Sequence, residues 1–380
     1  METEDSFSKG LEGVIAAQSS VCRIDGINSK LIYRGYNIHD LVRYSHFEET
    51  AYLLLFGSLP MASELADFSK KLASERSIPA ELIERIGSFP KSAHPMAVLR
   101  SAISLLSFFD PEADDKSPDS NVRKAIRLIA KTPAIIACFD RARHSQKFVA
   151  PRADGASNAA ENFLRMLKGK DPSAVEVKML DQYFILLAEH DLNASTFAAR
   201  ITASTLSDIY SAAVSAVGTL KGDLHGSANS HAMESLLEIG DVNKVEAYVD
   251  EALKNKKKLM GFGHRVYKGP DPRAADLKIM AKTLAEQDAA QAKWYAISEK
   301  LEKTVWERKK LNCNVDFYSA SVLYTIGIPV DLFTTMFAAS RMAGWTAHVL
   351  EQLSDNRLIR PLSHYVGRKD ESYVPLAARR

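Results

Sequence analysis

Two histidines lie in glycine-containing loops where their imidazoles could carry protons. His225 is followed by Gly226, and His264 lies between Gly263 and Arg265. Small neighbours let a ligand approach an imidazole closely, and histidine titrates near neutral pH. Both residues are therefore candidates for general acid–base chemistry, and a turn histidine with no chemical role is the alternative for each.

A carboxylate and an arginine extend this set toward binding of a small anion. Asp316 lies in the apolar and aromatic stretch 314–319, which would desolvate the carboxylate and make it a stronger base; a helix N-cap or turn aspartate is the alternative. Arg341 is four residues from both Phe337 and Trp345, so the three share one row of a helix. A guanidinium on an apolar row needs an anion, either an internal carboxylate or a carboxylate ligand.

Other motifs restrict the chemistry further. Arg273 and Arg360, in predicted loops beside prolines, are further candidates for anion binding, and a surface arginine is the alternative for each. The basic run at 254–258 is typical of a solvated face. His225 and His231 are six residues apart, and no His-x-x-x-His or Cys-x-x-Cys pair occurs. Phosphate-loop and nucleophile-elbow motifs are also missing. We therefore expect no bound metal and no resident cofactor.

Helical periodicity predicts most of the elements that must position these groups. Helices are predicted at 46–56, where Gly57 is a plausible stop, and at 121–140 and 177–190. The stretch 194–219 is rich in Ala, Ser, Thr and Gly. Small side chains let helices approach closely, so this stretch predicts a tightly packed core helix, or one that also packs against a second copy of the protein.

Strand signals are few, which makes the predicted fold class mainly α. Segments 20–24 and 30–33, separated by a turn-like sequence, predict one small N-terminal β-hairpin. The two histidine loops and the basic run separate the predicted helices in the second half of the chain. We expect a large helical domain formed by residues 1–224 and 326–380, with a smaller helical domain, 225–325, inserted into it.

Composition excludes several classes of protein. The 380 residues carry 49 Lys and Arg against 47 Asp and Glu, a formal net charge of +2, which excludes a strongly basic nucleic-acid binder and an acidic disordered chain. No run of about 18 apolar residues occurs, so no membrane span is expected. Cys22, Cys138 and Cys313 are too scattered for a disulfide framework, and the acidic start lacks a targeting signal. These features favour a cytoplasmic protein.

The motifs together resemble the citrate synthase family, almost from end to end. The most specific blocks, in order, are Asn193-Ala-Ser-Thr-Phe197, His225-Gly-x-Ala-Asn229, Gly261-Phe-Gly-His-Arg-Val-Tyr-Lys268, Asp271-Pro-Arg273 and Asn314-Val-Asp-Phe-Tyr-Ser319. The resemblance implies a large and a small helical domain that close on the substrate and exclude water. It also implies an enzyme that works without a metal, so arginines must supply the positive field.

The resemblance assigns a role to each candidate acid or base. Asp316 would remove a proton from the methyl group of acetyl-CoA, while His225, as a neutral imidazole, would donate a hydrogen bond to the thioester oxygen. The enol or enolate would attack oxaloacetate, and His264 would protonate the ketone oxygen. Hydrolysis of citryl-CoA would then release citrate and coenzyme A. The implied activity is that of an acyltransferase in which the acyl group becomes an alkyl group.

The resemblance also implies binding residues and a partner. The expected oxaloacetate-binding side chains are His190, Arg273, Arg341 and Arg360. Arg360 would reach in from the other subunit of a homodimer. Coenzyme A carries several negative charges and suits a basic patch. Its expected contacts are Lys256, Lys257, Lys268 and Lys309.

Departures from the family pattern surround His225. Asp223, Ser227 and Ser230 stand where proline, glycine and glutamate are common in the family, and these changes would alter coenzyme A binding or turnover. One alternative is a 2-methylcitrate synthase that takes propionyl-CoA, or both substrates, since one methylene is worth only ~1–3 kcal/mol of discrimination. The sequence at 264–267 and 314–318 favours acetyl-CoA. The remote alternative is a non-catalytic relative that binds acyl-CoA.

Overall fold

The computed structural model describes residues 7–155, 157–289 and 291–379. Within these residues the strands are β1 (Cys22–Asp25), β2 (Lys30–Tyr33) and β3 (Tyr36–Asn37), joined as one antiparallel sheet in the order β1-β2-β3. The predicted hairpin is confirmed, although β1 begins two residues later than expected. The third strand was not predicted, because two residues are too few to show an alternating pattern.

Helices make up most of the described chain, which confirms the mainly α fold class. They are α1 (Ile38–Tyr44), α2 (Phe47–Phe56), α3 (Ala62–Ser74), α4 (Ala80–Ser88), α5 (Pro95–Leu106), α6 (Pro118–Arg143), α7 (Ala159–Lys168), α8 (Ala174–Leu187), α9 (Ala194–Ser204), α10 (Ile209–Leu220), α11 (Ala228–Ile239), α12 (Val245–Lys254), α13 (Pro272–Gln287), α14 (Ala292–Lys309), α15 (Val315–Thr325) and α16 (Phe333–Ser354).

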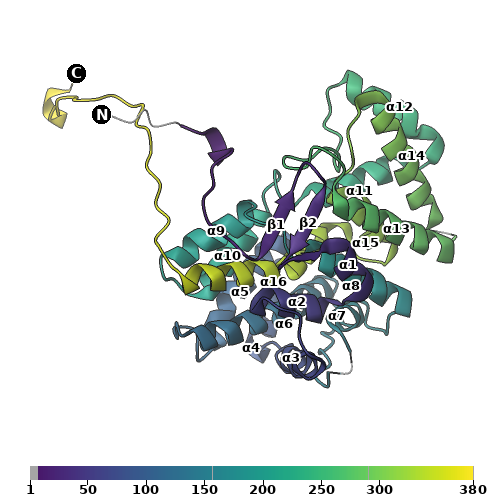
Figure 1. Ribbon diagram of the computed structural model, residues 1–380, viewed down its shortest axis with the longest axis horizontal. Helices are drawn as coiled ribbons and strands as arrows, with labels where there is room; N and C mark the ends of the chain where they lie inside the picture. The colour runs from purple at the N-terminus through teal and green to yellow at the C-terminus, as the bar shows by residue number, and fades with distance from the viewer. Residues whose placement is uncertain (1–6, 156, 290, 380) are drawn as a thin grey trace.

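Figure 1 shows how these helices are distributed. Helices α11 to α14 gather on one side of the view, whereas α2 to α7 form the opposite part of the body, and β1 and β2 stand near the middle. The chain after α16 leaves the helical body as an extended segment, and the described N-terminal residues also lie outside it. The predicted division at residues 225 and 325 stays a prediction.

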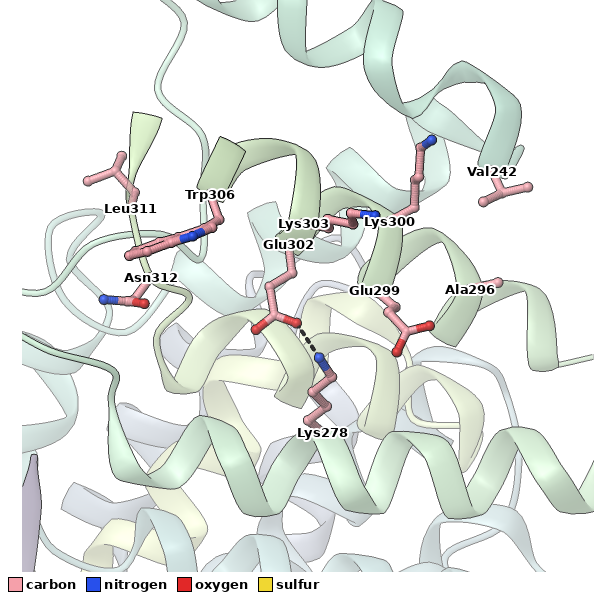
Figure 2. A pocket seen from close by; sticks show the side chains of 10 residues that line it. All are labelled: Val242, Lys278, Ala296, Glu299, Lys300, Glu302, Lys303, Trp306, Leu311 and Asn312. Atoms are coloured by element: carbon pink, nitrogen blue, oxygen red, sulfur yellow. Dashed lines mark hydrogen bonds and ion pairs between the residues drawn. The ribbon is translucent and has the colours of Figure 1, made fainter. Parts of the chain in front are cut away.

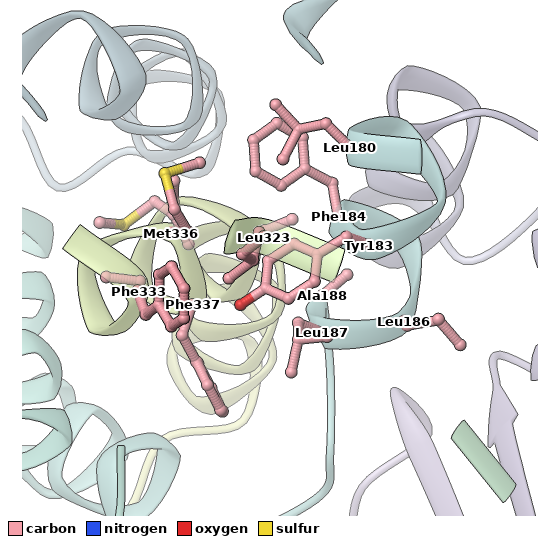
Figure 3. Close-up of a cluster of buried hydrophobic side chains, with 14 of the residues drawn as sticks. Leu180, Tyr183, Phe184, Leu186, Leu187, Ala188, Leu323, Phe333, Met336 and Phe337 are labelled. Carbon is pink, nitrogen blue, oxygen red and sulfur yellow. The ribbon is translucent and has the colours of Figure 1, made fainter. Parts of the chain in front are cut away.

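Helix α16 is the centre of the core. It packs against α2, α6, α8, α9 and α10, and nearly all of its side chains are buried. A helix that is covered on every side must be apolar on every side, as this one largely is. Figure 3 shows Phe333 and Phe337 of α16 together with Tyr183 and Phe184 of α8. Arg341, near the middle of α16, is therefore placed deep inside the protein, whereas Glu351 near its end is only partly buried.

One predicted helix differs from the observed structure. The small-residue stretch 194–219 is not one helix but two, α9 and α10, because the chain turns at Leu206 (φ 63°) and Asp208 then caps α10 by accepting from the Ser211 N–H at 2.9 Å. The two helices pack against each other and against α16. In contrast, the helix predicted at 121–140 is confirmed, since α6 covers this range and continues through Pro133.

A buried carboxyl in α8 gives a stability prediction. Burial, together with the charge of Glu48, raises the pKa of Asp181 to about 7. A raised pKa in the folded state stabilises it fully only below the ordinary pKa, and this contribution is lost as the pH rises through 7. Asp181→Asn keeps an acceptor for the Phe47 N–H, 3.1 Å away, and removes the charge.

We expect Asp181→Asn to raise the free energy of unfolding at pH 8 by about 1 kcal/mol or more beyond its effect at pH 5, because the cost of ionising the buried carboxyl grows between the ordinary pKa and about 7. Urea unfolding at the two pH values measures the difference. An effect of equal size at both pH values would contradict this explanation, because it would not arise from ionisation of Asp181.

Candidate active site

His225 lies in the loop between α10 and α11 and is held as a neutral donor. Its Nε2 accepts the backbone N–H of Ser195 at 3.3 Å and lies 2.8 Å from the Ser195 hydroxyl, to which Trp345 also donates. Because a backbone N–H can only donate, Nε2 is unprotonated and the ring proton is on Nδ1. Burial, with a smaller effect of Arg341, lowers the pKa of His225 to about 4.

Residues near His225 in the sequence fit the conformation of its loop. An added Cβ at Gly226 would lie 2.4 Å from the carbonyl oxygen of Leu220, so only glycine fits there. Two of the three departures from the family pattern make local hydrogen bonds: Ser227 donates to the Lys221 carbonyl at 3.2 Å, and Ser230 donates to the Val330 carbonyl at 3.0 Å. Both serines therefore bond to backbone around the His225 loop, and the third departure, Asp223, is exposed.

His264 is held in the opposite tautomer. Its Nδ1 accepts the backbone N–H groups of Val266 at 3.0 Å and Tyr267 at 3.1 Å, so the ring proton is on Nε2. Burial and the positive charge of Arg273 lower the pKa of His264 to about 4. Both histidines are therefore neutral at physiological pH, and each presents one N–H group as a hydrogen-bond donor.

Backbone pairing joins the His264 loop to the start of α15. The Gly263 N–H donates to Asn312, and the Asn314 N–H donates to Gly261, at 2.8 and 2.9 Å. Gly261 adopts φ 82°, and an added Cβ there would lie within 3.0 Å of Phe317. A glycine is therefore required at this position both by its backbone angle and by the close approach.

Asp316 lies in the first turn of α15 as a buried carboxylate with one free oxygen. The cap of this helix is Asn314, whose side chain accepts the Asp316 N–H at 3.0 Å, so the alternative of an N-cap aspartate is wrong. Among the residues that the structure describes, the buried Oδ1 has no hydrogen-bond partner. Burial raises the pKa of Asp316 to about 7, although the charge of Arg273 opposes the shift. A free carboxylate with this pKa suits a general base.

Arg273 is oriented by an aspartate that also joins two helices. It lies in the first turn of α13 rather than in the predicted loop. Asp271 binds its side chain through both oxygens, at 3.0 and 2.8 Å, and also accepts the Val315 N–H at 3.0 Å. All three groups are buried. Asp271 thus connects the first turn of α13 to the start of α15, which carries Asp316.

Arg341 is buried in α16 with one donor unused. Its Nε donates to the Leu187 carbonyl at 2.6 Å, and its Cζ lies 4.7 Å from the centre of the Phe337 ring, as the predicted row implies. The buried Nη2 has no partner, and no carboxylate in the described parts of the chain forms an ion pair with this guanidinium. An unused buried N–H of a guanidinium is a site for a carboxylate ligand.

His190 joins the same cluster. Its ring centre lies 5.5 Å from that of His264, and its Nε2 lies 3.2 Å from the Tyr267 hydroxyl. Burial lowers the pKa of His190 well below its usual range, and the charges of Arg273 and Arg341 add to the shift. The structure thus brings together six of the predicted residues: His190, His225, His264, Arg273, Asp316 and Arg341.

The remaining predicted residues lie elsewhere. Arg360 is exposed on the extended segment after α16, so this chain does not bring it to its own cluster. Among the described residues, no group of His, Cys, Asp and Glu side chains is arranged to hold a metal ion. The same residues include no helix long and apolar enough to cross a membrane.

The four lysines predicted to contact coenzyme A differ in their surroundings. Lys257 forms an ion pair with Glu238 at 3.1 Å. Lys256, Lys268 and Lys309 are exposed, and in the described part of the chain none of them forms an ion pair. Three exposed cations without a carboxylate partner remain available to phosphates.

A second feature near Asp316 is an open groove of about 800 Å³ between α13, α14 and residues 311–312, shown in Figure 2. Glu302, in this groove, accepts hydrogen bonds from Lys278 and from the Tyr318 hydroxyl, each at 2.6 Å. The Cys313 thiol lies 3.3 Å from its other oxygen. Because Cys313 and Tyr318 flank Asp316, Glu302 anchors the turn that carries the candidate base.

Several of these supporting residues were missed at the level of sequence. Ser195 and Asp271 belong to the quoted motifs, but nothing in their spacing shows that they orient His225 and Arg273. Trp345 was noted only as an apolar neighbour of Arg341. Glu302 lies in an ordinary amphipathic helix, and no local pattern distinguishes it from the solvated glutamates beside it.

Comparisons with known proteins agree with this geometry. The model of the citrate synthase C-terminal domain matches residues 10–362. Citrate synthase 2 of Bacillus subtilis is 50% identical over 98% of this chain and 99% of its own, and the 2-methylcitrate synthase of Shewanella oneidensis is 42% identical over 97% of both.

A solved structure agrees as well. Citrate synthase from Thermoplasma acidophilum, in ternary complex with carboxymethyl coenzyme A and oxaloacetate, matches with a TM-score of 0.91 and 34% identity over 98% of this chain and 99% of that one. Sequence, fold and the assembled cluster all agree, and this chain belongs to the citrate synthase family.

Proposed function

We propose that this protein condenses acetyl-CoA with oxaloacetate and water to give citrate and coenzyme A. The observation that carries the proposal is the free carboxylate oxygen of Asp316, buried in one cluster with two neutral histidines of opposite tautomer. The ligands of the Thermoplasma acidophilum enzyme support the choice of substrates. In this scheme the acetyl group is transferred and becomes an alkyl group.

In the first step Asp316 removes a proton from the methyl group of acetyl-CoA. The thioester oxygen gains negative charge, and the Nδ1–H of His225 donates to it. A neutral donor fixed in place by Ser195 stabilises that charge without rearranging. The raised pKa of Asp316 brings the base closer in strength to the carbon acid, while leaving it ionised in an appreciable fraction of molecules near pH 7.

In the second step the enol carbon attacks the ketone of oxaloacetate, and the Nε2–H of His264 protonates the resulting oxygen. Arg341 and Arg273 bind the carboxylates, because their guanidinium groups are buried and already oriented. His190 holds the same ligand. Water then hydrolyses the citryl-CoA thioester. In this hydrolysis His264 regains its proton from the attacking water, and the proton held by Asp316 goes to the departing thiolate.

We also propose that residues 225–325 form a small domain that closes over the substrates and shields the thioester from water. Lys256, Lys257, Lys268 and Lys309 would contact the phosphates of coenzyme A. Closure of this kind fits a site whose residues come from α13, α15 and α16 and from the loops after α8, α10 and α12.

The extended C-terminal segment supports a homodimer. It exposes apolar side chains that have no core of their own in this chain, among them Leu358, Leu362 and Val366. We propose that the segment packs on a second copy and brings Arg360 to the partner's oxaloacetate site. Light scattering should then give twice the 42.0 kDa mass of the chain, and a monomer would contradict the arrangement.

The function is tested by release of free thiol from acetyl-CoA or propionyl-CoA with oxaloacetate, comparing kcat/KM. A preference for acetyl-CoA supports the proposal. A preference for propionyl-CoA would make the protein a 2-methylcitrate synthase with the same chemistry. Some similar proteins carry that name, so both outcomes are consistent with the family. No release with either substrate would favour a non-catalytic relative.

A substitution in the groove tests whether Glu302 positions the base. Glu302→Gln removes one of the two acceptor oxygens that hold Cys313, Tyr318 and Lys278. We expect kcat to fall by a few-fold to about tenfold with KM for oxaloacetate unchanged, because small displacements of a reacting group are costly. Glu299→Gln in the same groove, where Glu299 only accepts from Tyr295 at 2.9 Å, should retain full activity. Equal kinetics in both variants would contradict the role of Glu302.

A further inference from the structure

A buried carboxylate that the proposed chemistry leaves unused lies next to the oxaloacetate cluster. Glu189 immediately precedes His190 and is 0% exposed, as is its partner His348 on α16. Its Oε1 lies 3.0 Å from the Nε2 of His348, and the Nη1 of Arg200 lies 3.1 Å from the Nδ1 of the same ring. Because a guanidinium only donates, Nδ1 accepts, and the imidazole donates its Nε2 proton to Glu189.

The second oxygen of Glu189 faces α16 and has no hydrogen-bond partner in the described part of the chain. An added Cβ at Gly344 would lie 2.1 Å from this Oε2, so the carboxylate packs directly on the bare backbone of the helix. Gly344 is three residues after Arg341 and four before His348, which places all three on one face of α16. The glycine is what allows a negative charge to approach the helix at this point.

Glu189 acts on Arg341 through its charge and not through contact. Burial lowers the pKa of Arg341, and among the groups that oppose this shift the carboxylate of Glu189 has the largest effect. No ion pair within 4.0 Å joins the two side chains in the described structure. The position of Arg341 is set by other groups, since its Nε donates to the Leu187 carbonyl and its guanidinium lies over Phe337.

We propose that Glu189 is the internal counter-charge of Arg341 and that it limits the affinity of the site for oxaloacetate. This inference rests on the proposed function, because it takes the oxaloacetate dianion as the ligand of Arg341. In the empty site the carboxylate offsets a buried cation. In the occupied site it repels the bound dianion, and it repels the more highly charged product citrate more strongly. Glu189 is therefore a positioning residue for charge and does not touch the substrate.

The test replaces the charge and keeps the shape. In Glu189→Gln the amide oxygen still accepts from His348, and Arg341 keeps its bonds. We expect oxaloacetate, titrated calorimetrically into the ligand-free enzyme, to bind roughly 3- to 30-fold more tightly than in the wild type. KM for oxaloacetate should fall with it, kcat should stay equal or fall as citrate leaves more slowly, and the ligand-free variant should unfold at a lower urea concentration.

The matched control is Glu48→Gln. Glu48 is also a buried carboxylate, but its charge faces His46 at 3.5 Å and Arg76 at 3.7 Å and lies near Asp181, away from Arg341. Its loss should change stability without changing affinity for oxaloacetate. Tighter binding in Glu189→Gln alone supports the inference, and a purely structural role of Glu189 would weaken binding or leave it unchanged.

The outcomes separate this inference from the proposed function. If the wild type binds oxaloacetate and Glu189→Gln binds it equally or less tightly, the inference that Glu189 limits affinity is wrong, while the proposed function stands. If the wild type does not bind oxaloacetate, the proposed function fails first. Should Glu189→Gln not fold, Glu189→Asp, which draws the carboxylate one methylene back from Gly344, should also lower KM, and an equal or higher KM would overturn the inference.

Discussion

Asp316→Asn is expected to lower kcat by about 10²- to 10⁴-fold while oxaloacetate still binds, because it removes only the base. The side chain keeps its volume, and the Oδ1 that it alters makes no hydrogen bond in the folded protein. Nothing structural therefore depends on the charge. Loss of a negative charge near Arg273 and Arg341 should not weaken binding of a dianion, so KM for oxaloacetate should stay equal or fall.

The pH dependence identifies the base. Wild-type kcat/KM should rise through about pH 7 as Asp316 ionises, whereas His225 and His264, with pKa values of about 4, are already neutral there. The residual kcat/KM of Asp316→Asn should not show this rise near pH 7. Asp181→Asn is the matched control, because Asp181 is also buried with its pKa raised to about 7 and lies outside the cluster. If both variants retain full activity, Asp316 is not the base.

Loop positions and residue types could be predicted from the sequence because they depend on local chemistry. Glycines at 226 and 261 mark places where only backbone fits, and they stand beside the histidines that the motifs single out. The row of Phe337 and Arg341 follows from helical spacing alone, and the structure confirms it. For Gly226, which approaches Leu220, and for the row on α16, a residue's neighbours along the chain are also its neighbours in space, whereas the close contact of Gly261 is with Phe317 of a later helix.

Tautomers and counter-charges could not be predicted in this way, because they depend on distant segments. The proton of His225 is placed by Ser195, thirty residues earlier, and Glu189 contacts a helix that begins at residue 333. The sequence placed Arg273 in a loop, whereas Asp271 caps a helix there and so brings the arginine into its first turn. The break between α9 and α10 was missed because small residues continue through it on both sides.

Arg341→Met is expected to raise KM for oxaloacetate by about 10²- to 10³-fold, with a smaller loss in kcat at saturation. The guanidinium is buried and holds one N–H without a partner, so a ligand carboxylate that binds it gains a charge-assisted bond away from water. Methionine matches the length of arginine but offers no donor. Arg341→Lys, which keeps the charge and loses the planar fork, should fall between the two.

Stability measurements on the same variant separate the role of Arg341 in binding from its role in the core. Arg341→Met alone leaves Glu189 buried without its counter-charge, so the ligand-free protein should unfold more easily than the wild type. Adding Glu189→Gln replaces both charges by neutral groups of similar shape, and much of the stability should return. Affinity for oxaloacetate should stay low in the double variant, because no neutral pair can supply the donor that the carboxylate needs. If the double variant recovers affinity as well as stability, Arg341 contributes only to the stability of the core, and the oxaloacetate carboxylate binds elsewhere.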